Sequence, residues 1–75
     1  MTMETLKSIL RELGFSVKET DLAVFVEDTP FAVKFDNTYR KYRIYKKHFT
    51  GSYMLAQSFS EMDDALGMLA GKVYN

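Results

Sequence analysis

The sequence contains no cysteine, a single histidine (His48) and a single proline (Pro30). Without cysteine the chain has neither disulfides nor thiolate ligands, and one histidine does not supply a histidine-based metal site. We therefore expect no metal site and no cofactor. The chain also lacks an apolar run near the roughly 20 residues that a membrane helix needs, and its start lacks the basic head and apolar stretch of a signal peptide. This predicts a protein without membrane contact, located in the cytoplasm.

Recognisable catalytic patterns are also absent. The sequence has no glycine-rich phosphate loop, no GxSxG elbow and no HExxH pair. A Ser-His-Asp triad would depend on His48, which falls in a predicted hairpin loop. The carboxylates Glu61, Asp63 and Asp64 match no calcium loop and suit the first turn of a helix, where the helix dipole favours negative charge. We predict a non-enzymatic protein, with an enzyme of unrecognised type as the remaining alternative.

The length of 75 residues predicts one domain, residues 1 to 75, because a single core stops growing only at several times this length. Hydrophobic residues make up 47% of the chain and charged residues 27%, which is typical of a folded protein rather than a disordered one. A domain of this size commonly gains only about 3 to 5 kcal/mol from its core. Association with a second copy or another protein is therefore an alternative to consider.

The first predicted element is a helix over residues 3 to 13, where apolar residues recur at the three-four spacing of one helix face. Thr2 is expected to cap its start, and Gly14 is expected to end it in the left-handed conformation. Phe15 would then fold back on Leu10, as in a Schellman motif.

The last predicted element is a helix over residues 59 to 70, again with a single apolar stripe. Ser58 followed by Glu61 has the spacing of a capping box, and Ser60 is the competing cap. Gly71 is expected to end the helix.

Between the helices lie short alternating or apolar runs separated by turn-forming residues, the pattern of an antiparallel meander. The expected strands cover residues 15 to 18, 22 to 27, 31 to 35, 39 to 47 and 53 to 57. The predicted fold class is α+β: an N-terminal helix, an antiparallel meander of four to five strands and a C-terminal helix, with both helices packed on one face of the sheet. The phenylalanines expected in the core are Phe15, Phe25, Phe31, Phe35 and Phe59.

The most unusual segment is TYRKYRIYKKH, residues 38 to 48. The formal charge of the whole chain is zero, yet residues 34 to 48 carry six basic side chains and one acidic one. Alternation places Tyr42 and Ile44 toward the helices, because Ile44 is the one aliphatic residue of this strand. The open face is then predicted to present interleaved tyrosines and cations: Lys34, Tyr39, Lys41, Arg43, Tyr45 and Lys47.

Cations neutralise phosphates and aromatic rings stack on unpaired bases, so we interpret this face first as a surface for nucleic acid or another polyanion. An acidic protein surface is a second partner with matching charge. The alternative without a binding role is a strand face that is simply exposed to solvent, because tyrosine is favoured in strands and long basic side chains cover sheets well. Pairing of the cations with Glu19, Asp21, Glu27 or Asp28 would cancel the field that a polyanion needs.

A second surface is predicted on the C-terminal helix. Gly67 and Gly71 fall on the side away from the apolar stripe, with Met68 beside them. Glycine inside an exposed helix costs about 1 kcal/mol relative to alanine, so close approach of another chain is one explanation and unselected drift is the other. This helix face, or an edge of the sheet, is the predicted contact of the alternative function: a protein interaction module that forms a homodimer or binds a host protein.

Overall fold

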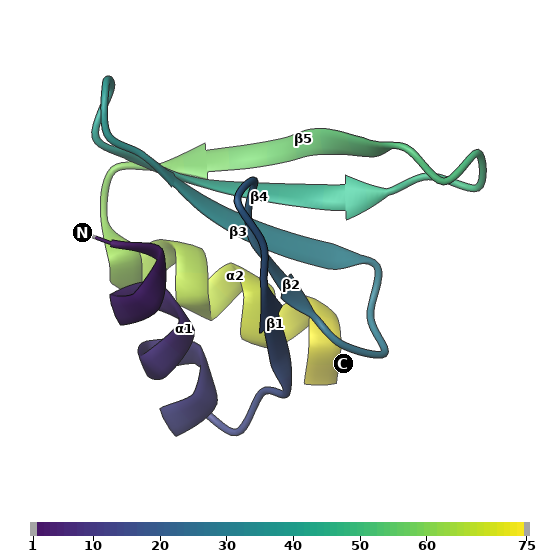
Figure 1. The fold of residues 1–75 in the computed structure, drawn as a ribbon, viewed down its shortest axis with the longest axis horizontal. Helices are drawn as coiled ribbons and strands as arrows, with labels where there is room; N and C mark the ends of the chain where they lie inside the picture. The colour runs from purple at the N-terminus through teal and green to yellow at the C-terminus, as the bar shows by residue number, and fades with distance from the viewer. Residues whose placement is uncertain (1, 75) are drawn as a thin grey trace.

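The computed structural model describes residues 2 to 74 and arranges them as a helix, five strands and a second helix (Figure 1). The elements are α1 (Met3–Glu12), β1 (Val17–Glu19), β2 (Val24–Val26), β3 (Phe31–Asp36), β4 (Lys41–Lys47), β5 (Tyr53–Phe59) and α2 (Met62–Tyr74). The strands lie in the sheet in chain order, each antiparallel to the next. The predicted fold class is confirmed.

Both helices lie on the same face of the sheet, as predicted (Figure 1). α1 contacts β1, β2 and β3, whereas α2 contacts β4 and β5. Ile44 is fully buried and Tyr42 packs against the core, so the predicted inward face of β4 is confirmed. The buried residues that form this core are Leu6, Leu10, Phe15, Val17, Val24, Val26, Phe31, Val33, Ile44, Ala65 and Leu69.

Both ends of α1 follow the local signals in the sequence. The Thr2 hydroxyl accepts a hydrogen bond from the backbone N–H of Thr5 at 3.1 Å, which confirms the predicted N-cap. Gly14 has a φ of 95°, and the backbone N–H of Phe15 donates to the carbonyl of Leu10 at 3.1 Å. This is the hydrogen-bond pattern of a Schellman motif, and it places Phe15 in the core.

The prediction for the second helix is wrong at both ends. α2 covers Met62–Tyr74 rather than residues 59 to 70, and it continues through Gly71. Ser58 is not a cap, because Ser58 and Phe59 extend β5 by pairing with residues of β4. Strand pairing with a neighbour that is distant in sequence has outweighed the local capping pattern.

The strand predicted at residues 39 to 47 begins only at Lys41. Tyr39 and Arg40 belong to the preceding turn, where Arg40 has a φ of 54°. The Asp36 carboxylate builds this turn, because its Oδ1 accepts backbone N–H groups two and three residues ahead, at 2.9 and 3.2 Å.

Two further predictions need correction. The first strand lies at Val17–Glu19 rather than at residues 15 to 18, because Phe15 belongs to the end of α1. Phe25 is not in the core: its two neighbours in β2 are buried toward the helices, so alternation points Phe25 to the opposite face. That face is the open face of the sheet, and its residues are described next.

Candidate functional site

A continuous row of side chains crosses the open face from one edge of the sheet to the other. Lys18 of β1 lies opposite Phe25, and Phe25 lies opposite Ala32 of β3. Ala32 in turn lies opposite Tyr45 of β4, and Tyr45 opposite Leu55 of β5. Residues directly opposite one another in antiparallel strands share a face, so these five side chains form one transverse row.

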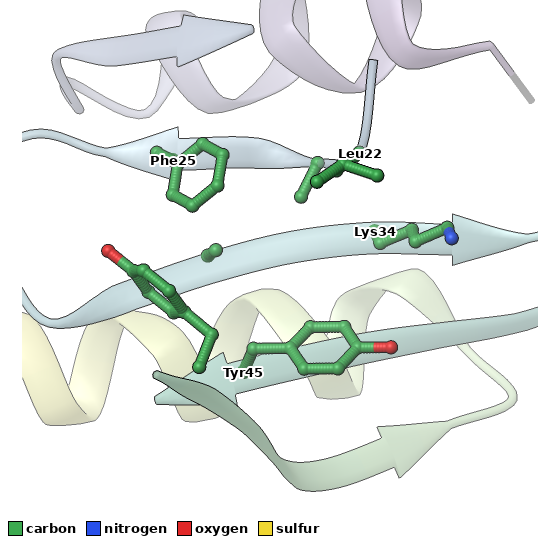
Figure 2. A pocket seen from close by; sticks show the side chains of 7 residues that line it. Leu22, Phe25, Lys34 and Tyr45 are labelled. Carbon is green, nitrogen blue, oxygen red and sulfur yellow. The ribbon is translucent and has the colours of Figure 1, made fainter. Parts of the chain in front are cut away.

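The centre of the transverse row is a hollow of about 380 Å³. Ala32 lies at its floor, because this small side chain sits between two larger neighbours, Phe25 and Tyr45. Figure 2 shows Phe25 and Tyr45 on two sides of the hollow, with the ammonium of Lys34 near the end toward which the Tyr45 hydroxyl points. The ring of Tyr53 adds a further wall and meets the Phe25 ring edge-on, with 5.1 Å between their centres.

Arg43 lies next to the transverse row and is held in place by three partners. Its Nε donates to Asp36 Oδ2 at 3.1 Å, and its Nη1 donates to the Ser58 hydroxyl at 3.1 Å. Its guanidinium carbon is 6.0 Å from the centre of the Tyr39 ring. The charge of Arg43 is therefore largely matched within the protein.

Asp36 is kept ionised by the same arrangement. The backbone N–H of Tyr39, and after it the Arg43 guanidinium, lower the pKa of the Asp36 carboxyl from its ordinary value. At neutral pH this carboxylate is thus a stable negative partner for Arg43.

The lysines of the open face differ from Arg43 because no carboxylate is paired with them in the part of the chain that the structure describes. Lys41 donates a hydrogen bond to the Ser60 hydroxyl, which is neutral. Glu19, one of the four carboxylates considered as alternative partners of these cations, instead contacts Lys7 of α1 at 3.2 Å. The register places these lysines on the open face: Lys18, Lys34, Lys41 and Lys47.

Charged side chains are distributed differently over the two helices and over the open face. Within the two helices the described residues include four acidic side chains and three basic ones. Among the paired strand residues of the open face, by contrast, the four lysines and Arg43 stand against the single carboxylate Asp36. The strand residues of the open face are therefore strongly basic, although the formal charge of the whole chain is zero.

The structure brings five of the six predicted site residues together on the open face: Lys34, Lys41, Arg43, Tyr45 and Lys47. Tyr39 lies outside the strand, in the turn, and its ring lies beside the Arg43 guanidinium of this face. The sequence prediction missed Lys18, Phe25 and Tyr53, because their membership depends on which strands are neighbours and in which register.

The three residues predicted to form a helix interface do not share one environment. Gly67 is exposed, and a Cβ added to it would meet no atom within 4 Å. Met68 is half-buried and packs against the core, and Gly71 is half-buried. These three residues therefore differ in burial, and the helix interface that they were predicted to form stays a prediction.

Gly67→Ala is expected to stabilise the protein by about 1 kcal/mol, because the substitution gains helix propensity and meets open space. Urea unfolding followed by circular dichroism measures the change. An unchanged or lowered free energy of unfolding in dilute monomer would contradict this prediction and would indicate that glycine is required there.

In residues 2 to 74 no group of three or more histidine, aspartate or glutamate side chains is placed to hold a metal ion. Neither helix in this part of the chain has the length and apolar character to cross a membrane. Comparisons of the chain with known protein families, curated proteins and solved structures found no match.

Proposed function

We propose that this protein is a non-enzymatic domain that binds single-stranded nucleic acid across the open face of its sheet. The observation that carries the proposal is the transverse row, where aromatic rings around a hollow are bordered by lysines that have no carboxylate partner among the described residues.

The hollow suits an unpaired base. Phe25, Tyr45 and Tyr53 surround a space of about 380 Å³ and offer ring surfaces on which a flat aromatic group can stack. Stacking of a base on a protein aromatic ring contributes about 1 to 3 kcal/mol, and it needs no particular base sequence. Bases inside a duplex are already stacked on one another, so a single strand is the form that fits this hollow.

The lysines suit the phosphates on either side of such a base. Lys34 lines the hollow itself, Lys18 ends the transverse row, and Lys47 lies opposite Tyr53. Each ammonium group that neutralises a phosphate releases counterions, which favours binding at low salt. Arg43 contributes less to this field, because Asp36 already matches its charge.

An acidic protein surface is the competing partner for the same cations. It would satisfy the lysines but would leave the aromatic hollow without a role. The hollow therefore favours nucleic acid over an acidic protein, and substitution of its rings distinguishes the two partners.

Salt dependence provides the first test. With about four phosphate contacts, the binding constant for a short mixed-sequence DNA strand should fall with a log-log slope of about −3 and weaken about 50-fold between 50 and 200 mM salt. Fluorescence anisotropy measures this, and a duplex of the same length should bind more weakly. No binding to either DNA at 50 mM salt would overturn the proposal, and so would binding that does not respond to salt.

A further inference from the structure

The two edges of the sheet differ in length and charge. β1 has three residues, two of them charged, Lys18 and Glu19. β5 has seven residues, YMLAQSF, with neither a charged residue nor a proline. Charge, proline and short length are the usual means by which natural proteins prevent an edge strand from pairing with another chain. β1 has two of these protections and β5 has none of them.

The first half of β5 is also uncovered. Tyr53, Met54 and Leu55 are 37%, 56% and 49% exposed, although they alternate between the two faces of the sheet. Figure 1 shows the cause: the turn between β4 and β5 extends away from both helices, so neither helix covers this half of the strand. Phe49 at the same turn is almost fully exposed. The far end of β5 is different, because Phe59 packs against the core.

We propose that this edge binds a second copy of the chain, with the two β5 strands antiparallel about a two-fold axis. A strand without charge meets its own copy without like-charge repulsion, and a two-fold contact needs only one self-complementary patch. The short, charged β1 edge does not continue the pairing, so the assembly closes at two chains.

A bulge fixes where the axis lies. The pairing with β4 shifts between Ile44 and Tyr45, so Ala56 is extra and the regular alternation of β5 stops there. An axis at Ala56 would set Leu55, on the open face, against Gln57 of the partner subunit, which lies on the other face. An axis at Met54 avoids this mismatch. It places Tyr53 opposite Leu55 of the partner subunit and Met54 opposite Met54 of the partner subunit, all apolar contacts.

Such a dimer has one continuous sheet. A two-fold axis between antiparallel strands of one sheet runs perpendicular to it, so both helical layers lie on one side and both open faces on the other. The two hollows then share one surface. The dimer itself does not depend on the proposed function.

A single cysteine tests the axis, because the chain has none of its own. Directly opposed residues in antiparallel strands have Cα atoms about 4.5 to 5.5 Å apart, within the disulfide range of about 4.4 to 6.8 Å. Met54→Cys should therefore form a disulfide-linked dimer on mild oxidation, seen in a non-reducing gel. The matched control is Gln57→Cys, which is exposed on the same strand beyond the bulge and should remain mainly monomeric.

Sedimentation of the unmodified chain gives an independent measurement. We expect a mass near twice the 8.7 kDa of one chain at submillimolar concentration, and a return to one chain for Leu55→Lys. A monomer throughout, assemblies that grow beyond two chains, or equal cross-linking of both cysteine variants would overturn the proposal. These measurements contain no oligonucleotide, so their failure is distinct from failure of the proposed function.

Discussion

Replacing Leu69 by alanine should leave much of the protein unfolded at 25 °C. Leu69 is 0% exposed in α2 and belongs to the core between the helices and the sheet. Truncation of a buried leucine costs about 2 to 5 kcal/mol, because it removes apolar contacts and leaves a cavity. A core of this size commonly yields only about 3 to 5 kcal/mol in total, so a single truncation removes most of the stability.

The matched control is Leu22→Ala, the same chemical change at a leucine that is 71% exposed at the rim of the hollow. Its free energy of unfolding should change by no more than about 0.5 kcal/mol. Urea unfolding followed by far-UV circular dichroism measures both variants. Equal loss of stability in the two would contradict the placement of the core between the layers.

The double substitution Lys34→Glu with Lys47→Glu should weaken binding of a single DNA strand about 100-fold at 50 mM salt. Removal of one lysine–phosphate interaction weakens binding about 8-fold at this salt concentration, so removal of two weakens it about 60-fold, and the new carboxylates add repulsion. The log-log slope against salt should become shallower by about 1.4. Fluorescence anisotropy gives both quantities.

The charge control for this experiment is Lys46→Glu with Lys72→Glu, which changes net charge by the same amount away from the open face. Lys46 lies opposite the inward-facing Phe31, and Lys72 lies in α2. Equal weakening by both double variants would show that total charge, rather than the open face, governs binding.

The substitution Asp36→Asn offers the reverse change. It removes the carboxylate that is paired with Arg43, so affinity for the single DNA strand should rise a few-fold.

The elements that sequence reasoning located correctly are those whose signals are local. The Thr2 cap and the Gly14 ending of α1 depend on residues within a few positions, and the structure contains both. The start of α2 was predicted wrongly, because it does not depend on nearby residues alone. Ser58 and Phe59 lie in a local capping pattern, yet they pair with residues of β4. Local propensity is a weak prior that strand pairing readily overrides.

The same distinction applies to the candidate site. Alternation along one strand placed Tyr45 and its neighbouring cations on a shared face. It could not place Lys18 and Tyr53 there, because their position depends on the order and register of other strands. The partner of Arg43 was also missed: Asp36 reaches it across the β3–β4 pairing, whereas Glu19 lies on the helix side near Lys7.

The strand order also bears on how the chain folds. Every pairing in the sheet joins strands that are consecutive in the sequence. The loops that must close before each hairpin forms its hydrogen bonds are therefore short, and the entropy cost of closing them is small. Chains dominated by such near-neighbour pairings cross a lower folding barrier than those with distant pairings of similar stability. A small core of limited stability is thus combined with a topology that favours rapid refolding after each opening.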